Sequence, residues 1–391
     1  MSQLYLPIVR NGKVPIQTAS GVEKTIRIHE LHMEEDAGKL IHDEWDDCSL
    51  VDYNRSGVPL IEIVSEPDMR NAQEVIAYLE KLRLICQYLG VSDCKLQEGS
   101  MRADVNLSVR ELGSQELGTR TEMKNLNSFK AIARAIEGER ARQIELLEEG
   151  RPVIQETRRW DDNKEYSYAM RSKEDAKDYR YFPDPDLPPV RISDEWIRRI
   201  REAQPELQEE KAKRYMEQYG LSDYDAGLLT QSRHLGEMFE NTASICQMPK
   251  KAANWYIGET LRLVKEEGME TEDISFSPEH LAELILMTDR GELNNKTAKE
   301  VFRMIFTEDV DPVVYAEEKG LKTVLDTGLL EETVAKVLEE NPDTVKQYLD
   351  GKTKVTGFLV GQIMKQMKGK ADPKQVNQLL NQKLKEAGEK A

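Results

Sequence analysis

The side chains best suited to chemistry lie in residues 98–127, where two short alternating runs flank a connection bounded by Gly113 and Gly118. Successive residues of a strand point to opposite faces of a sheet, so the pattern predicts an antiparallel hairpin with one polar and one apolar face. The polar face would carry five residues: Arg102, Asp104, Asn106, Glu122 and Lys124. Carboxylates, an amide and cations can together bind a metal ion and phosphate oxygens. A solvated sheet surface is the alternative interpretation.

Polar residues elsewhere in the N-terminal half could contribute to the same chemistry. Asn125, Asn127 and Ser128 precede a predicted helix, whose first N–H groups favour anions. The three adjacent acids at 34–36 are either a solvated loop or metal ligands. Both interpretations stay open on the sequence alone.

One carboxylate and two histidines lie in or beside predicted strands. Glu62 interrupts the apolar run 58–64, and because a buried unpaired carboxylate is costly, it needs a partner or must face a site. His29 and His32 lack the spacing of a helical zinc motif. We expect both to be ordinary strand histidines.

The surrounding pattern predicts a sheet-containing first half and a helical second half. Apolar alternation indicates strands at 22–33, 58–64 and within 153–182. Helical spacing indicates helices at 71–89 and 128–149, with Gly90 and Ser128 as end signals. Four prolines between Pro183 and Pro189 break regular structure, and the chain beyond residue 194 keeps helical spacing. We therefore expect an α+β fold that ends in small helix bundles.

Composition narrows the class of protein. No apolar run approaches the roughly 20 residues that span a bilayer, the start lacks a secretory signal, and the four cysteines contain no CxxC pair. We expect a cytoplasmic protein without a membrane partner. The net charge is −17, but residues 352–391 contain nine Lys and only three acids. An acidic body with a basic tail predicts that a polyanion binds at one end of the chain only, the basic C-terminal end.

Nucleotide-binding loops of the common kinds are absent from the sequence. Residues 351–353 read Gly-Lys-Thr, but Lys346 stands where a Walker loop needs its first glycine, and there is no GxGxxG. Nucleotide chemistry would therefore need a different architecture built on the sheet.

Several long strings resemble one family, the B subunits of the aspartyl/glutamyl-tRNA amidotransferases. They are LHMEEDAGK (31–39), VDYNRSGVPLIEIVSEPD (51–68), EGSMRADVNLSVR (98–110), TEMKNLNSF (121–129), DYRYFPDPDLPP (178–189), RYMEQYGLSDYDAGLLT (214–230) and GFLVGQIMKQMKGKADPKQVNQLL (357–380). The likeness covers essentially the whole chain in the family's order.

The resemblance implies a fold and an activity. The fold is a glutamine-synthetase-like antiparallel cradle, N-terminally incomplete here (1–194), followed by an all-α domain (195–300) and an all-α YqeY-like tail (301–391). The family's GatB/YqeY homology region, which is longer than this tail, would start near residue 240. The activity is that of a carbon–nitrogen ligase with glutamine as amido donor, in a heterotrimer with A and C subunits. With ATP and Mg²⁺, the B subunit phosphorylates the side-chain carboxylate of Glu-tRNA(Gln), Asp-tRNA(Asn) or both, and ammonia then displaces phosphate.

The same resemblance suggests roles for individual residues. Glu35 and Glu122 match family metal-site positions, and we add Glu34 as a third metal ligand from its neighbourhood. Arg102 and Lys124 would contact phosphate and, with Glu35 and Glu122, form the catalytic set. The cofactor-binding residues would be Asn106 and Asn125, to which we add Asp104 and Glu98 from their face and neighbourhood. The tRNA-binding residues would be Lys365, Lys368, Lys370 and Lys374.

One departure from the family pattern concerns the start of the chain. Family members carry a Gly-Leu-Glu-x-His segment that helps to bind the metal, and this sequence does not contain it. We expect Met1 to be an internal methionine of a longer reading frame. The alternative functions are a tRNA- and subunit-binding module without catalysis and, less well supported, an archaeal-type E subunit, for whose inserted synthetase-like domain the chain has no room.

Overall fold

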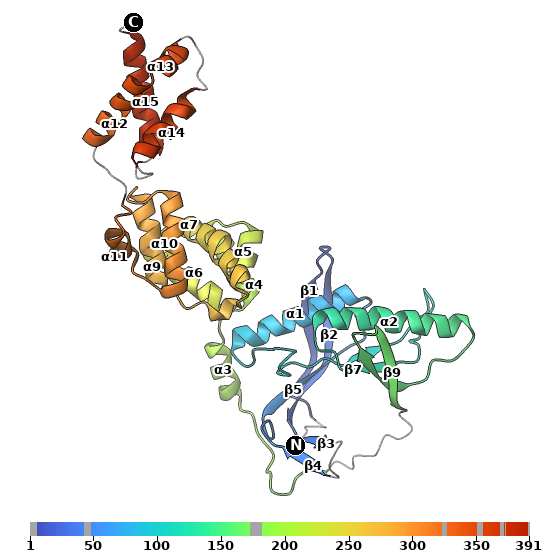
Figure 1. Cartoon of the computed structure of the whole chain (residues 1–391). Coiled ribbons are helices and arrows are strands. Elements are labelled where there is room, and N and C mark those ends of the chain that lie inside the picture. Colours follow the sequence, from blue (N-terminus) through green and yellow to red (C-terminus); the bar gives the residue numbers. More distant parts are fainter. Residues whose placement is uncertain are drawn as a thin grey trace. The chain divides into compact units, whose positions relative to one another are not determined.

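The computed structural model describes residues 6–42, 48–172, 182–322, 327–349, 355–367, 371 and 373–389. The chain divides into two compact units, Met1–Pro205 and Glu206–Ala391 (Figure 1). Among the described residues, no helix combines the length and the apolar character needed to cross a bilayer.

The first sheet of the N-terminal unit has three antiparallel strands in the order β1–β2–β5: β1 (Val9–Gln17), β2 (Glu23–Glu35) and β5 (Pro59–Ser65). Ile26 and Ile28 of β2 lie in the core, and a bulge at residues 28–30 then shifts the pairing with β5. A separate hairpin pairs β3 (Lys39–His42) with β4 (Ser49–Asp52). The strands expected at 22–33 and 58–64 are confirmed.

The second sheet has the order β6–β7–β8–β9: β6 (Val105–Leu107), β7 (Thr121–Lys124), β8 (Glu156–Asp161) and β9 (Tyr166–Ser172). The predicted hairpin is confirmed, because β6 and β7 pair antiparallel with Asn106 opposite Glu122. One pairing was not expected: β7 and β8 are parallel. The helix α2 connects them, and such a crossover permits parallel strands.

Two long helices cover the strands: α1 (Ala72–Leu89) and α2 (Phe129–Glu148). Both predicted end signals are confirmed: Ser128 caps α2 through a hydrogen bond to the Ala131 N–H, and Gly90 ends α1 in the left-handed conformation with φ of 68°. The two helices pack against each other (Figure 1), α1 contacts β1, and α2 contacts β6 and β9. Their shared core includes Ile132 and Trp160.

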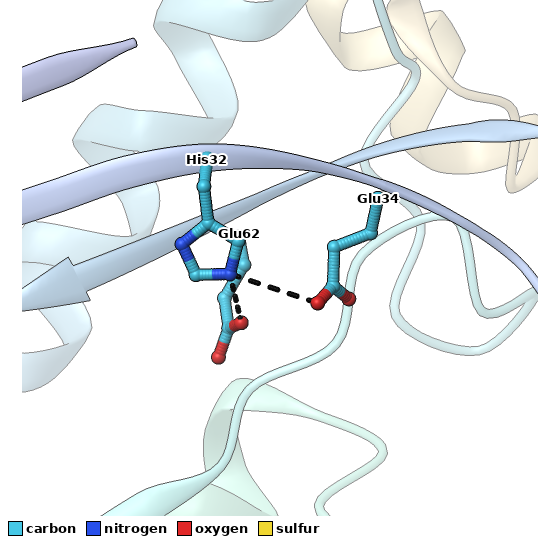
Figure 2. Close-up of side chains that lie close together, drawn as sticks. All are labelled: His32, Glu34 and Glu62. Atoms are coloured by element: carbon cyan, nitrogen blue, oxygen red, sulfur yellow. Dashed lines mark ion pairs between the residues drawn. The ribbon is translucent and has the colours of Figure 1, made fainter. Parts of the chain in front are cut away.

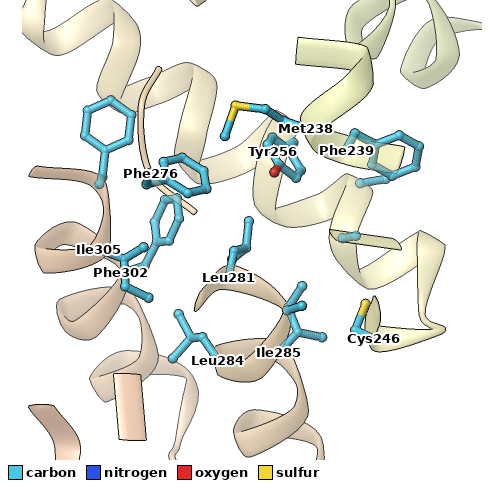
Figure 3. Packing of buried hydrophobic residues seen from close by; sticks show 14 of the residues in the cluster. Met238, Phe239, Cys246, Tyr256, Phe276, Leu281, Leu284, Ile285, Phe302 and Ile305 are labelled. Carbon is cyan, nitrogen blue, oxygen red and sulfur yellow. The ribbon is translucent and has the colours of Figure 1, made fainter. Parts of the chain in front are cut away.

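The helix α3 (Asp194–Ala203) follows the proline-rich segment and has no buried residue. The C-terminal unit begins with a helical domain made of α4 (Gln208–Tyr219), α5 (Asp223–Leu229), α6 (Arg233–Cys246), α7 (Pro249–Trp255), a π-helical turn (Tyr256–Thr260), α8 (Leu261–Glu267), a 3₁₀ turn (Thr271–Asp273), α9 (Pro278–Asp289), α10 (Asn295–Glu308) and α11 (Pro312–Glu318). Its core is rich in aromatic rings, including Phe239, Tyr256, Phe276 and Phe302 (Figure 3).

The last four helices have a core of their own. They are α12 (Thr327–Glu340), α13 (Pro342–Leu349), α14 (Thr356–Gln366) and α15 (Pro373–Glu389). Val334, Leu359, Ile363 and Leu380 are fully buried in it. The predicted fold class, antiparallel sheets followed by helical domains, is therefore confirmed, whereas the domain limits at 194 and 300 stay predictions.

Candidate functional site

The polar face of the β6–β7 hairpin brings opposite charges together. Lys124 Nζ lies 2.9 Å from Asp104 Oδ2 and 3.4 Å from Glu122 Oε1. Thr157 of the neighbouring β8 donates to Glu122 Oε2 at 2.8 Å. Partial burial lowers the pKa of Lys124, but Asp104 and Glu122 outweigh that effect and hold the pKa above its ordinary value. Lys124 is therefore a fixed cation between two carboxylates.

The opposite face of the same strand is fully buried, as the alternation predicts. Thr121 and Met123 are both 0% exposed. Because Glu122 and Lys124 alternate with these two residues, the core fixes the direction in which the charged side chains point. Asn106 completes the polar face as the cross-strand neighbour of Glu122.

A second ion-pair group connects the end of β2 with the segment that leads into β6. Asp36 Oδ2 accepts from Arg55 Nε at 2.8 Å and from Arg102 Nη2 at 3.3 Å. Arg55 Nη1 also donates to the carbonyl of Gly99 at 3.0 Å. Asp36 thus holds Arg102, which was predicted to contact phosphate, beside the three-acid segment.

A buried polar network lies behind the hairpin and is centred on Glu139 of α2. Glu139 is 0% exposed, and its carboxylate accepts from Thr121 Oγ1 at 2.8 Å and from Ser167 Oγ at 3.1 Å. Arg142 lies 2.6 Å and Arg158 3.5 Å from it. Burial raises the pKa of Glu139, but the hydrogen bonds from Arg142, Gln143 and Thr121 outweigh it, so the net pKa lies below its ordinary value.

Gln143, one turn further along α2, joins this network to β6. Its Nε2 donates to the carbonyl of Leu107 at 3.2 Å and to Thr121 Oγ1 at 2.9 Å, and its Oε1 accepts from the Val109 N–H at 3.1 Å. A single side chain of α2 therefore contacts both strands of the hairpin from behind.

Figure 2 shows a third group, formed by His32, Glu34 and Glu62. His32 Nε2 lies 2.6 Å from Glu62 Oε2 and 3.6 Å from Glu34 Oε1. His32 and Glu34 share one face of β2, and Glu62 is the direct cross-strand partner of His32 in β5. Glu62 thus has a partner, as expected, although its side chain is 55% exposed and not buried as the apolar run suggested. By the same alternation, Glu35 points to the other face of β2 from Glu34.

Comparison with known proteins identifies the family of this chain. Residues 1–198 match the family model of the GatB/GatE catalytic domain, and residues 237–384 match that of the GatB domain. The B subunit of the aspartyl/glutamyl-tRNA(Asn/Gln) amidotransferase of Agathobacter rectalis is 63% identical over 380 residues, which are 97% of this chain and 80% of that protein. The B subunits of the same name from Lachnospira eligens and Caldicellulosiruptor bescii are 62% and 52% identical over 391 and 387 residues, covering 98% of this chain and 81% and 80% of their own lengths. This chain belongs to the family of these B subunits.

The family assignment confirms the resemblance, and the structure then distributes the expected site residues among different groups. Asp104, Asn106, Glu122 and Lys124 share the hairpin face, and Arg102 is held by Asp36. Glu34 instead lies beside His32 and Glu62, and Glu35 ends β2 in an exposed position.

Two of the expected cofactor-binding residues have local partners. Asn125, in the left-handed conformation with φ of 68°, donates from Nδ2 to the carbonyl of Trp160 at 3.0 Å. Glu98 lies 3.2 Å from Lys95, three residues before it. Their roles toward a nucleotide stay predictions.

The expected tRNA-binding lysines lie in the last two helices and in the sequence between them. Lys365 is exposed on α14. Lys368 and Lys370 lie outside the described residues, and Lys374 lies in α15 with its side chain outside the description. Their role also stays a prediction.

Sequence reasoning missed His32 as a potential ligand. The available signal was a histidine near the end of the predicted strand 22–33, a glutamate two residues after it, and the expectation that Glu62 has a partner or faces a site. Only the register of β2 against β5 brings these residues together.

Proposed function

We propose that this chain is the carboxylate-activating subunit of a tRNA-dependent amidotransferase, a carbon–nitrogen ligase. It transfers the γ-phosphoryl group of ATP to the side-chain carboxylate of Glu-tRNA(Gln), Asp-tRNA(Asn) or both. Ammonia released from glutamine then attacks the acyl phosphate, inorganic phosphate leaves, and the amide forms. The observation that carries the proposal is the β6–β7 face, where Lys124 lies between Asp104 and Glu122 in a chain of this family.

The chemistry explains why such residues are needed. A carboxylate is a poor electrophile toward ammonia, and phosphorylation gives it a leaving group. Phosphoryl transfer between two anions is catalysed mainly by positioning and by cations that offset the developing charge. Lys124 and Arg102 supply fixed positive charge, and the raised pKa of Lys124 keeps it protonated at neutral pH. Asn106 orients the phosphate from the neighbouring strand.

The donor set at this face fits a magnesium ion. Mg²⁺ prefers carboxylate and phosphate oxygens. Glu122 offers a carboxylate at this face, and we propose Glu35, at the end of β2, as the second carboxylate ligand. When bound with ATP, the ion neutralises charge on the phosphate oxygens. Thr157 holds one oxygen of Glu122 through its hydrogen bond, which leaves the other oxygen beside Lys124. Glu34, the third carboxylate expected to bind Mg²⁺, lies in the group with His32.

The proposed partners follow from the same family. The A subunit supplies ammonia, the C subunit completes the heterotrimer, and the basic tail binds the misacylated tRNA through Lys365, Lys368, Lys370 and Lys374. The reaction takes place in the cytoplasm, where these tRNAs are used. A tRNA- and subunit-binding module without catalysis is the alternative, and the alignment of 97% of this chain with an amidotransferase B subunit favours the enzyme.

The test is transamidation by the chain purified with its A and C subunits. Glu122→Gln should retain the fold and complex formation. The rate of ATP-dependent formation of Gln-tRNA or Asn-tRNA should fall at least about 100-fold, the usual effect of removing an electrostatic contact to the reacting groups. The matched control is Glu116→Gln, which makes the same charge change at an exposed position of the β6–β7 connection and should keep full activity.

Two results would contradict the proposal. If Glu122→Gln has the activity of the unmodified chain, Glu122 has no role in the site. A heterotrimer that binds misacylated tRNA but shows no tRNA-stimulated hydrolysis of ATP would favour the binding module.

A further inference from the structure

We propose that His32, Glu34 and Glu62 form a binding site for one divalent transition-metal ion of the Mn²⁺ or Zn²⁺ kind. The site is distinct in its ligands from Glu35 and Glu122, to which we assign the Mg²⁺ of the nucleotide. It rests on the geometry of β2 and β5 and does not depend on the proposed function.

The backbone places the three ligands together. His32 and Glu34 are two residues apart in β2 and therefore project from the same face. Glu62 is in register with His32 on the adjacent strand β5, and directly opposed side chains on neighbouring antiparallel strands are within contact. All three positions belong to hydrogen-bonded strands, so the sheet fixes their spacing before any ion binds.

The side chains have separations close to those of a metal site. One ligand atom from each residue lies within 4.8 Å of the others, with His32 Nε2 at 2.6 Å from Glu62 and at 3.6 Å from Glu34. Ligand atoms about 2.1 Å from a metal lie roughly 3.0–3.4 Å apart in octahedral or tetrahedral geometry. Small rotations of the two carboxylates would therefore bring all three atoms to bonding distance of one ion.

Charge and exposure favour a cation at this point. Two carboxylates beside a neutral imidazole carry a charge of about −2, which a divalent ion neutralises. The side chain of His32 is only 12% exposed, whereas that of Glu62 is 55% exposed. The site is therefore anchored at the histidine and open at the carboxylate, where solvent ligands complete the coordination.

The donor set selects the class of ion. Imidazole nitrogen suits Zn²⁺ and other late first-row metals, and carboxylate oxygen suits Mn²⁺ as well as Mg²⁺ and Ca²⁺. One nitrogen with two carboxylates favours Mn²⁺ or Zn²⁺ over Mg²⁺, which prefers an all-oxygen shell.

The test is direct binding of Mn²⁺ to the full chain, without ATP, tRNA or partner subunits. The chain is first treated with a chelator and dialysed, and free Mn²⁺ is then measured by electron paramagnetic resonance during a titration. We expect one bound ion that Zn²⁺ displaces and that a 100-fold excess of Mg²⁺ does not. His32→Gln and Glu62→Gln should each weaken this binding at least about 10-fold. Glu62→Gln preserves the size of the side chain, so it tests the site even if His32→Gln does not fold.

The chain offers a matched control. His29 Nδ1 lies 2.9 Å from Glu66 Oε1, which is another histidine–glutamate pair beside the same strands. Within the described part of the chain, the only group of three possible ligands is the one around His32, so the His29 pair has no third ligand. His29→Gln should therefore leave Mn²⁺ binding unchanged. The proposal is overturned if the chain binds no Mn²⁺, or if His32→Gln or Glu62→Gln binds it as tightly as the unmodified chain.

This experiment also separates the metal site from the proposed catalysis. Glu122→Gln should abolish transamidation and keep the His32-dependent ion. Loss of that ion in Glu122→Gln would overturn the separation of the two ligand sets.

Discussion

Replacing Glu139 with glutamine should destabilise the N-terminal unit by about 3 kcal/mol. Glu139 is 0% exposed and carries the negative charge that Arg142 and Arg158 face. Glutamine has nearly the same shape, but it removes that charge and turns one acceptor into a donor that faces Thr121 or Ser167.

The magnitude follows from the surroundings of the two arginines. Removing one partner of a buried ion pair typically costs about 3–5 kcal/mol, because the other charge stays buried without compensation. The lower end applies here for two reasons. Arg158 keeps its ion pair with Glu156, and the side chain of Arg142 is 18% exposed and so stays partly hydrated.

The same helix provides the control. Glu137 and Arg140 form an ion pair with the same spacing of three residues, but their side chains are 50% and 55% exposed. Exposed pairs of this kind contribute about 0.5 kcal/mol or less. Glu137→Gln therefore makes an identical chemical change on α2 with a much smaller expected cost.

The assay is native-state hydrogen exchange of the α2 and β7 amides in the full chain, at increasing urea concentrations. It reports the free energy of opening of this unit and does not require the whole chain to unfold in one step. We expect Glu139→Gln to lower that free energy by about 3 kcal/mol and Glu137→Gln by less than about 0.5 kcal/mol. Equal values for the two variants would refute the conclusion that burial of the charge network stabilises the hairpin.

Two other predictions concern acid pH and the helical core. In the folded chain the pKa of Glu139 lies below its ordinary value of 4.5. The stabilisation that ionised Glu139 gives is therefore complete above pH 4.5 and is lost as the pH falls through the lower, folded-state pKa. The opening free energy of α2 should fall less steeply below pH 4.5 in Glu139→Gln than in the unmodified chain, and equal slopes would contradict this. Phe302 is 1% exposed and contacts the rings of Trp255 and Phe276, so Phe302→Ala should lower the free energy of unfolding of the helical domain, measured by urea denaturation, by about 3–5 kcal/mol. Phe358, which is 51% exposed, provides the control. An equal loss of unfolding free energy in Phe358→Ala would contradict the role of the aromatic core.

The sequence was sufficient for features that depend on neighbours along the chain. The two-residue period of residues 102–110 and 119–124 predicted the hairpin and its polar face, and Gly90 and Ser128 marked helix ends, because strand alternation and helix capping are local. The long family strings added the fold class and the activity. The apolar run also led us to expect a partner for Glu62, and the partner is present, but the burial behind that expectation is not, because the side chain is 55% exposed.

Only the tertiary structure decided which distant residues meet. Asp36 holds Arg102 across 66 residues, Thr121 bonds to Glu139 across 18, and His32 meets Glu62 through the register of β2 and β5. The same strand geometry separated Glu34 from Glu35, which are adjacent in the sequence. A local pattern determines which face a side chain takes, but a shift of one residue in the pairing would exchange the faces. Register and helix packing therefore determine the partners, and these depend on the whole folded unit.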